Sequence, residues 1–453
     1  MTSAGSADRA APLPLAGAPA AVGGPAARRV VIVGGGMAGA RLADRLAAGP
    51  DTAVTVLGEE PHPAYNRVLL AEVLAGRYPA EVIALPAPAG PVRHRPGVRA
   101  VRVDRAERRV VCDDGSVEPY DALVLATGSN PVLPPLRGLF TPTGHELPAG
   151  VRAFRTMDDA LALADACDGA GGTRAVVIGG GLLGVSAARA LAHRGVRVLL
   201  AHQGEHLMER HLDRDAAELL RSHLIELGVE VHTECRVRGV RTEPGDPTRP
   251  ARAVELADGY LLEAEQVVLA CGVRPRVGLA RAAGLAVDRG VVVDDRLTTS
   301  DPRVHAIGDC AEHRGTLYGL AGAAREQADA LARVLAGDPD PCPYPGTRAL
   351  TRLTLPAAPA PVPAPVGAGP TGPTGFDLAA FGDPVPAPGD DVVQLADATR
   401  GAYRRLVVRG DRLRGGVLLG DLGAVGSLAR TWESDEALPA TPLLHLLTPD
   451  GGL

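Results

Sequence analysis

Two glycine-rich turns in this chain have the spacing that lets a backbone hold a pyrophosphate. In a G-x-G-x-x-G turn the first glycine makes the tight bend, the second lets the pyrophosphate approach, and the third lets a helix pack closely on a strand. The two turns read GGGMAG and GGGLLG, so we expect two bound dinucleotides. The residues predicted to contact them are Gly34, Gly36, Met37, Ala38 and Gly39 in the first turn, and Gly179, Gly181, Leu182, Leu183 and Gly184 in the second.

The elements expected around each turn are those that such a site requires. A β-branched run at 28–33 precedes the first turn, followed by a helix at about 37–48 and a second strand at 53–57. The second turn repeats this order, with strands at 173–178 and 196–201 and a helix between them. A helix that begins at such a turn points unpaired N–H groups and the positive end of its dipole at the phosphates.

The residue that follows each second strand differs between the two sites. Glu59 lies about 20 residues beyond the first turn, where a carboxylate accepts hydrogen bonds from a ribose, and Glu60 is the alternative partner. In the second site this position holds His202. A carboxylate there favours NAD and an arginine favours NADP. Histidine leaves the coenzyme open, because it either contacts a 2′-phosphate or is simply a surface residue at a strand end.

Three further motifs accompany the double turn: DALVLATG at 121–128, its echo QVVLACG at 266–272, and RVHAIGDCA at 303–311. With them the chain resembles the FAD-dependent pyridine nucleotide–disulfide oxidoreductase superfamily over residues 28–345. The resemblance implies an α/β fold with two Rossmann-like domains, one for FAD and one for NAD(P)H.

The same resemblance assigns further cofactor contacts. It places Thr127 and Gly128 near the flavin, and Gly308 and Asp309 in the second flavin motif, where Asp309 hydrogen-bonds the ribitol chain. The alternative for Asp309 is the N-cap of a helix at 319–335, a position that an aspartate also suits.

A narrower resemblance rests on PHPAYNRVLLAEVLAG at 61–76, HLMERHLD at 206–213 and AEHRGTLYGL at 311–320. These segments are similar to the flavin part of the large subunit of assimilatory NAD(P)H nitrite reductases and to the electron-transfer subunits of assimilatory nitrate reductases. The likeness implies that Arg67 lies against the flavin or its phosphates. The alternative is a surface arginine at the start of a helix.

Composition and absent motifs exclude several functions. The net charge is −6 and no basic stripe is present, so nothing favours nucleic-acid binding. No apolar stretch approaches the roughly 20 residues of a membrane helix. Segment 61–85 has no cysteine, which argues against disulfide reduction. Hydride transfer needs no general acid or base, so we predict no catalytic side chain, and the scattered cysteines predict no metal site.

The expected architecture has one dinucleotide-binding domain inserted in the other. We expect a cytoplasmic protein with a disordered tail at 1–27, FAD-binding segments at 28–150 and 285–345, an NAD(P)-binding domain at 151–284, a small strand-rich C-terminal domain at 346–435, and a tail at 436–453. We expect a Pro/Ala/Gly insertion at 355–375 to interrupt the C-terminal domain. The Pro-rich stretch 85–98 is predicted to be shorter than the strand-containing segment that related proteins have there.

The function expected from these observations is transfer of electrons from NAD(P)H through FAD to a redox partner protein. The chain ends without the cluster-binding half of a nitrite reductase, so the expected acceptor is a separate nitrate or nitrite reductase component. Two alternatives stay open: a ferredoxin or rubredoxin reductase of the same fold, with a ferredoxin-type acceptor, and a regulatory flavin-binding module with little turnover. A homodimer is also possible at this stage.

Overall fold

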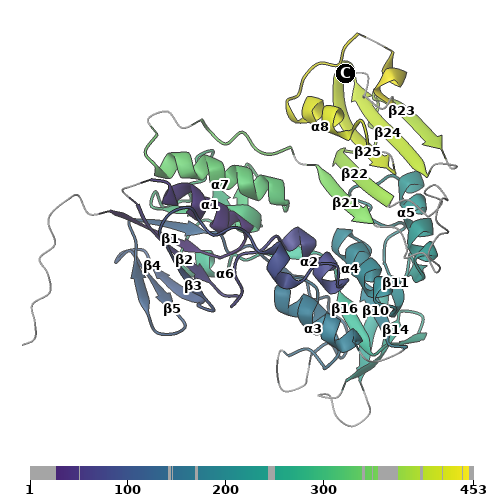
Figure 1. Ribbon diagram of the computed structural model, residues 1–453, viewed down its shortest axis with the longest axis horizontal. Coiled ribbons are helices and arrows are strands. Elements are labelled where there is room, and N and C mark those ends of the chain that lie inside the picture. The colour runs from purple at the N-terminus through teal and green to yellow at the C-terminus, as the bar shows by residue number, and fades with distance from the viewer. Residues whose placement is uncertain are drawn as a thin grey trace, which may run out of the picture.

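The computed structural model describes residues 27–49, 52–140, 144, 146–168, 172–242, 250–338, 342–348, 350–355, 376–397, 401–420, 422–440 and 442–447. The predicted tail at 1–27, except its last residue, lies outside the described residues. So do most of the insertion predicted at 355–375 and the end of the chain from 448. The described chain forms two α/β units and a C-terminal sheet (Figure 1).

The first unit is built on a five-stranded parallel sheet in the order β19-β7-β1-β2-β3. Its central strand is buried from Val30 to Val33, as expected for a parallel strand covered on both faces. The edge strand β3 lies inside the Pro-rich stretch 85–98. The elements are β1 (Arg28–Val33), α1 (Met37–Ala47), β2 (Thr52–Gly58), β3 (Val92–Pro96), β7 (Ala122–Leu125), α6 (Gly278–Ala282), β19 (Val304–Ala306) and α7 (Ala321–Leu335), with a meander of β4 (Ala100–Asp104), β5 (Arg109–Cys112) and β6 (Val117–Pro119) and a pair of β18 (Val291–Val293) and β20 (Ala311–His313).

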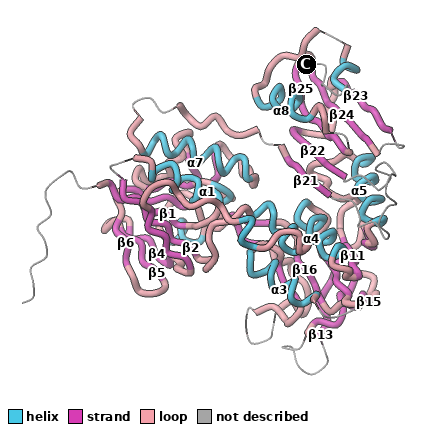
Figure 2. Tube along the Cα trace, in the orientation of Figure 1, coloured by secondary structure: helices cyan, strands magenta, loops and turns pink. Residues whose placement is uncertain are grey.

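The second unit repeats this plan with the parallel order β12-β11-β10-β16-β9. An antiparallel sheet of three strands again lies beside the parallel one (Figure 2). The elements are β9 (Val151–Ala153), α3 (Met157–Cys167), β10 (Arg174–Ile178), α4 (Leu182–His193), β11 (Arg197–Ala201), α5 (Arg214–Glu226), β12 (Val229–His232), β13 (Val237–Thr242), β14 (Ala251–Leu256), β15 (Leu261–Glu263) and β16 (Gln266–Leu269).

The second unit is inserted between β7 and β19 of the first. The chain leaves through β8 (Ser129–Pro131) and returns through β17 (Val273–Pro275), and these two strands pair antiparallel as a two-stranded ribbon. This arrangement confirms the predicted α/β fold with one Rossmann-like unit inside the other. In the described part of the chain, no helix is long and apolar enough to cross a membrane.

One segment packs across a predicted domain border. Residues 65–83 include η1 (Arg67–Leu69), α2 (Leu70–Leu74) and η2 (Ala80–Ile83), and were assigned to the FAD-binding domain. Leu70 and Leu74 are buried in the core of the second unit, where α2 contacts α3 and α4. Segment 65–83 therefore belongs to the first unit by sequence and to the second by packing.

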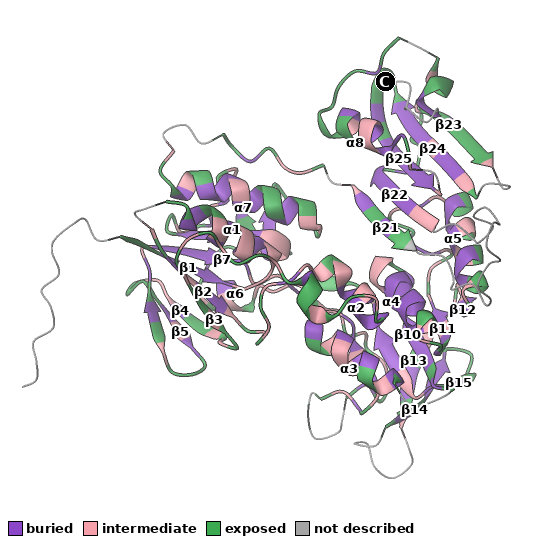
Figure 3. Ribbon diagram, in the orientation of Figure 1, coloured by how far each residue is buried: buried purple, intermediate pink, exposed green. Residues whose placement is uncertain are grey.

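The C-terminal sheet has the antiparallel order β21-β22-β25-β24-β23. Along β22 the side chains alternate: Leu378 and Ala380 join the core of the second unit, whereas Ala379 and Phe381 belong to the core that includes α8. Most of β22 is coloured as buried in Figure 3. The Tyr403 hydroxyl donates a hydrogen bond of 2.7 Å to Asp213, the N-cap of α5. The elements are β21 (Thr351–Leu355), β22 (Phe376–Gly382), β23 (Asp391–Asp397), β24 (Ala402–Arg409), β25 (Arg412–Leu419), α8 (Val425–Glu433) and η4 (Leu443–Leu447).

The tail predicted at 436–453 is in part a folded element. Leu438, Leu446 and Leu447 are buried in the same core as α8, and the Arg404 guanidinium donates to the Leu447 carbonyl. The short apolar run that forms η4 has no helical periodicity long enough to be recognised, so the sequence pattern missed it.

Candidate functional site

The first glycine turn leaves an open space in front of α1. Gly34 has a φ of +123°, and a Cβ there would lie 2.0 Å from the Ala126 carbonyl oxygen. A Cβ on Gly39 would lie 2.0 Å from the Gly34 carbonyl oxygen, whereas a Cβ on Gly36 would meet nothing within 4 Å. Gly36 is the N-cap of α1 and offers no side-chain cap to the first turn, which begins with Met37 and Ala38. The helix N-terminus therefore faces a space that suits an anion.

The second turn repeats this geometry in front of α4. Gly179 has a φ of +114°, and its Cβ would lie 2.4 Å from the Ala270 carbonyl oxygen. A Cβ on Gly184 would lie 1.7 Å from the Gly179 carbonyl oxygen, and one on Gly181 would again meet nothing within 4 Å. The first turn of α4 begins with Leu182 and Leu183, and no side chain caps it. The structure thus contains two equivalent cradles.

The other predicted flavin contacts converge on the first cradle. A Cβ on Gly34 would lie 3.2 Å from the Thr127 nitrogen, and one on Gly308 would lie 3.1 Å from the Ala38 Cβ. Gly128 has a φ of +71° and open space beside it. Three segments far apart in the sequence therefore meet at the start of α1.

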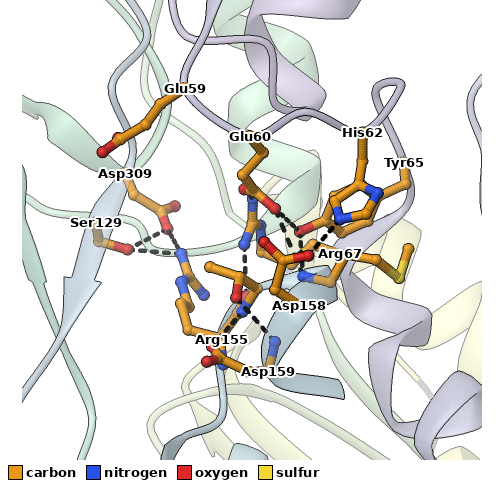
Figure 4. Close-up of polar contacts among 12 residues, drawn as sticks. Glu59, Glu60, His62, Tyr65, Arg67, Ser129, Arg155, Asp158, Asp159 and Asp309 are labelled. Atoms are coloured by element: carbon orange, nitrogen blue, oxygen red, sulfur yellow. Dashed lines mark hydrogen bonds and ion pairs between the residues drawn. The ribbon is translucent and has the colours of Figure 1, made fainter. Parts of the chain in front are cut away.

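Asp309 does not cap the following helix, so that alternative was wrong. It lies in the short helix η3 (Gly308–Cys310), and α7 begins only at Ala321, with Leu320 as its N-cap. The carboxylate instead accepts hydrogen bonds from the Ser129 hydroxyl at 2.8 Å and from the Arg155 guanidinium at 2.6 Å (Figure 4).

Arg155 is a site residue that the sequence did not reveal. It lies between β9 and α3, and its guanidinium reaches Asp309 and Ser129 in the first unit. The carboxylate of Asp159 accepts from its backbone N–H and forms a capping box with Thr156. That box could be anticipated from the T-x-x-D pattern, but the long-range pairing of Arg155 could not. Its Nε–H is buried and has no hydrogen-bond partner among the described residues, as expected for a group that faces a polar ligand.

Arg67 joins the same cluster from the opposite side. Its guanidinium donates to the carboxylate of Glu60 at 2.6 Å and to the backbone carbonyl of Arg155. It also lies 5.0 Å from the centre of the Tyr65 ring. The Arg67 side chain is 24% exposed, so the alternative of a surface arginine was wrong, although Arg67 does begin the short helix η1.

The two adjacent acids have different environments. Glu60 accepts hydrogen bonds from Tyr65 at 2.7 Å and from Arg67. Burial alone would raise the pKa of Glu60, but the charge of Arg67 and these hydrogen bonds outweigh it and lower this pKa below its usual range. Glu59 is exposed, has no dashed contact with the residues drawn in Figure 4, and pairs with Arg276. The Glu59 side chain is the more exposed of the two, at 41% against 27% for Glu60.

His202 packs against the second glycine turn and is hydrogen-bonded to it. Its Nδ1 accepts a hydrogen bond of 3.1 Å from the backbone N–H of Gly180, and its Nε2 is shielded from solvent. Burial lowers the pKa of His202, which keeps the ring neutral. Nε2 is therefore not at the surface, and like the Nε of Arg155 it has no hydrogen-bond partner among the described residues.

The fold and the two cradles are those of a protein that binds two dinucleotides, since both turns leave open the side that a pyrophosphate requires. Residues 28–328 match the pyridine nucleotide-disulphide oxidoreductase family, and the chain belongs to this family.

Two named relatives are similar to this chain over most of its length. The chain is 32% identical over 432 residues to nitrite reductase [NAD(P)H] of Bacillus subtilis (strain 168), which covers 93% of this chain and 49% of the relative. It is 32% identical to the assimilatory nitrate reductase electron transfer subunit of the same organism, covering 87% of this chain and 48% of the relative. The chain thus spans about half the length of these curated relatives. Among solved structures, putidaredoxin reductase in its covalent complex with putidaredoxin matches with a TM-score of 0.76 and 24% identity, covering 93% of this chain and 98% of that one.

Proposed function

We propose that this protein passes electrons from NAD(P)H through FAD to a redox partner protein of nitrate or nitrite assimilation. The observation that carries the proposal is the pair of equivalent cradles in a chain that matches a nitrite reductase and a nitrate reductase electron transfer subunit over most of its length. The names of these two relatives supply the metabolic context, and the acceptor is proposed to be a separate protein.

The first cradle is proposed to hold FAD. Its ligands are proposed to be the residues at the start of α1 and those that converge on it, namely Gly34, Gly36, Met37, Ala38, Gly39, Glu59, Arg67, Thr127, Gly128, Gly308 and Asp309, with Arg155 added from the structure. The supporting observation is that two carboxylates and two arginines gather beside this cradle, where a ligand with hydroxyl groups and phosphates would find donors and acceptors.

The second cradle is proposed to hold the nicotinamide coenzyme through Gly179, Gly181, Leu182, Leu183 and Gly184. FAD, when bound, takes up two electrons as a hydride and releases them singly, which suits a one-electron acceptor. The side chains described here bind and orient the two dinucleotides.

Arg155 is proposed to fix the carboxylate of Asp309 for the flavin side of the reaction. It comes from the second unit, and its ion pair with Asp309 joins the two units beside the first cradle. Arg67 donates a hydrogen bond to the backbone carbonyl of Arg155 and so helps to hold Arg155 in place. The two arginines are balanced by Glu60 and Asp309, so the cluster carries little net charge before a ligand binds.

A ferredoxin-type acceptor is the second candidate. The chain is 34% identical to the biphenyl dioxygenase system ferredoxin–NAD(+) reductase component of Paraburkholderia xenovorans (strain LB400), covering 62% of this chain and 67% of the relative. The putidaredoxin complex has the same fold. The two candidates differ in the acceptor and share the flavin and coenzyme sites. The homodimer and the cytoplasmic location stay predictions.

The test is an anaerobic absorption titration of the purified protein with NADH and, separately, with NADPH. We expect an oxidised-flavin spectrum that at least one coenzyme bleaches. The reduced protein is then mixed with a purified nitrate reductase, a nitrite reductase or a ferredoxin. Reoxidation by a nitrate or nitrite reductase component supports the leading candidate, and reoxidation by the ferredoxin alone favours the second. Absence of flavin, or a flavin that neither coenzyme bleaches, refutes both.

A further inference from the structure

The segment that leads out of the first unit inserts one tyrosine into it. Residues 342–348, here called the strap, lie between α7 and β21 of the C-terminal sheet (Figure 1). Tyr344 is only 2% exposed, whereas Pro343 and Pro345 on either side of it are exposed. Its backbone N–H donates a hydrogen bond of 2.7 Å to the Asp295 carbonyl. The strap is therefore anchored on the first unit through one buried side chain.

The socket that receives Tyr344 is built by the AEHRGTLYGL segment at 311–320, which the proposed cofactor contacts do not use. The centre of the Tyr344 ring lies 4.9 Å from that of His313 and 6.0 Å from that of Tyr318. His313 is fully buried, and its Nε2 lies 2.9 Å from the Asp295 carboxylate. Its Nδ1 lies 3.2 Å from the Tyr318 hydroxyl oxygen. This segment therefore fixes the strap.

A buried glutamine connects Tyr344 to the first cradle. Gln327 lies in α7 and is 1% exposed. Its Nε2 donates to the Tyr344 hydroxyl oxygen at 3.4 Å, and its Oε1 accepts from the Gly308 N–H at 2.7 Å. Burial raises the pKa of Tyr344, so the hydroxyl keeps its proton and donates a hydrogen bond of 2.6 Å to Thr347. Gly308 in turn lies against the start of α1, since its Cβ would be 3.1 Å from the Ala38 Cβ.

We propose that Gln327 and Tyr344 are positioning residues of the first cradle: the strap in its socket holds the Gln327 amide against Gly308 and so favours the conformation that binds FAD. This inference rests on the proposed function of the first cradle as the FAD site. Both residues act on FAD through Gly308. Because a coupling free energy is reciprocal, bound FAD in turn holds the strap in its socket.

The first test compares FAD binding with folding. Gln327→Met keeps the length of the side chain but leaves the Gly308 N–H without an acceptor, so the turn at 307–309 gains conformations that do not bind FAD. If the competent fraction falls to about a tenth, the dissociation constant of FAD rises about tenfold. Tyr344→Phe weakens the same contact from the strap side, and we expect a rise of about threefold. The matched control is Tyr403→Phe, which removes a hydrogen bond between the C-terminal sheet and α5 and should leave FAD affinity unchanged.

Three assays separate positioning from stability: flavin fluorescence for the dissociation constant, visible circular dichroism of the FAD-saturated protein, and urea unfolding of the apoprotein. We expect the variants at 327 and 344 to change the first two. A purely structural role would lower only the unfolding free energy of the apoprotein. Dissociation constants within twofold of the original in both variants, or an equal loss of affinity in Tyr403→Phe, overturn the inference.

A glycine of the strap provides a variant that alters neither Gln327 nor Tyr344. Gly346 has a φ of +99°, and a Cβ there would lie 2.8 Å from the Tyr318 hydroxyl oxygen. Gly346→Ala should therefore displace the strap and weaken FAD binding by about threefold to tenfold. Gly337, just after α7, has a φ of +78°, and its Cβ would meet nothing within 4 Å. Gly337→Ala thus carries a similar backbone strain without the contact, and equal FAD affinity in the two variants contradicts the inference.

Hydrogen exchange on the unaltered protein tests the reciprocal effect. The Tyr344 N–H, bonded to the Asp295 carbonyl, reports whether the strap is in its socket. We expect bound FAD to slow exchange in residues 342–348 about tenfold relative to the apoprotein. Amides of the β4–β5 pair are the reference for a general change in stability. Exchange that slows equally in both places, or does not slow in the strap, contradicts the inference.

The inference and the proposed function fail in different ways. If a coenzyme bleaches the bound FAD but the variants at 327 and 344 bind FAD normally, the function stands and the positioning role is wrong. If these variants weaken FAD binding as expected and neither coenzyme bleaches the flavin, the positioning role stands and the electron-transfer function is wrong. If the protein binds no FAD, both are wrong.

Discussion

Replacing Gly36 by alanine should separate the space reserved for a ligand from the packing of the fold. The backbone of Gly36 has φ −77° and ψ −171°, which alanine adopts without strain, and its Cβ would meet nothing within 4 Å. We therefore expect Gly36→Ala to change the unfolding free energy by no more than about 0.5 kcal/mol. The matched control is Gly39→Ala, whose Cβ would lie 2.0 Å from the Gly34 carbonyl oxygen. Since backbone must move there, a loss of about 3 kcal/mol is expected.

Gly36→Ala should weaken FAD binding strongly, although it hardly changes the unfolding free energy. In Gly36→Ala the new methyl group occupies the space in front of α1 that a pyrophosphate would take. Losing one or two hydrogen bonds to a charged phosphate costs about 3 kcal/mol, or about 100-fold in the dissociation constant. The assays are urea unfolding followed by circular dichroism and FAD binding to the apoprotein followed by flavin fluorescence. The reasoning is refuted if Gly36→Ala binds FAD as tightly as the original protein, or unfolds as readily as Gly39→Ala.

Three further predictions concern polar contacts elsewhere. Arg155→Met and Asp309→Asn, combined in a double-mutant cycle, should show a coupling free energy of about 2 kcal/mol in urea unfolding, because the two side chains are only 15% and 22% exposed. Additivity of the two effects within about 0.5 kcal/mol would contradict this prediction. Burial in β19 lowers the pKa of His305 from 6.5 to about 4. Below pH 6.5 the unfolded chain therefore binds a proton at His305 that the folded chain does not bind. The unfolding free energy should fall by up to about 3 kcal/mol as the pH is lowered towards 4, and His305→Leu should reduce this dependence of stability on pH. Tyr403→Phe should cost about 1 kcal/mol by removing the hydrogen bond to Asp213, and limited proteolysis should then release the C-terminal sheet faster, whereas an unchanged rate would rule out a role in docking.

The features that the sequence predicted are those coded by contiguous residues. The β1–turn–α1 and β10–turn–α4 units follow from an apolar run, a glycine pattern and a helical period within about 20 residues. Gly34, Gly39, Gly179 and Gly184 have a local steric reason, whereas Gly36 and Gly181 leave open space. The family resemblance singled out Asp309 through a short motif, and its contact with the flavin stays a prediction. The α/β fold with an inserted unit then followed from the order of the motifs along the chain.

The features that the sequence missed depend on contacts between distant segments. Arg155 and Asp309 are 154 residues apart in the chain, and no local pattern distinguishes Arg155 from other arginines. The role of His202 depends on a hydrogen bond to Gly180, a residue that the G-x-G-x-x-G pattern treats as variable. Helix α2 is too short for its apolar positions to reveal which core they join. Each of these cases is decided by tertiary packing, which overrides local preference.

The two cradles are equivalent in their glycines and differ in the polar side chains beside them. At the first cradle, the turn at 34–39 meets residues 126–127 and Gly308, and the neighbouring Asp309 pairs with Arg155. The second turn meets residues 270–271 and, through Gly180, His202 and Leu207. Because Arg155 belongs to the second unit, a dinucleotide at the first cradle would lie beside an ion pair that joins the two units, whereas the contacts named here for the second turn lie within the second unit.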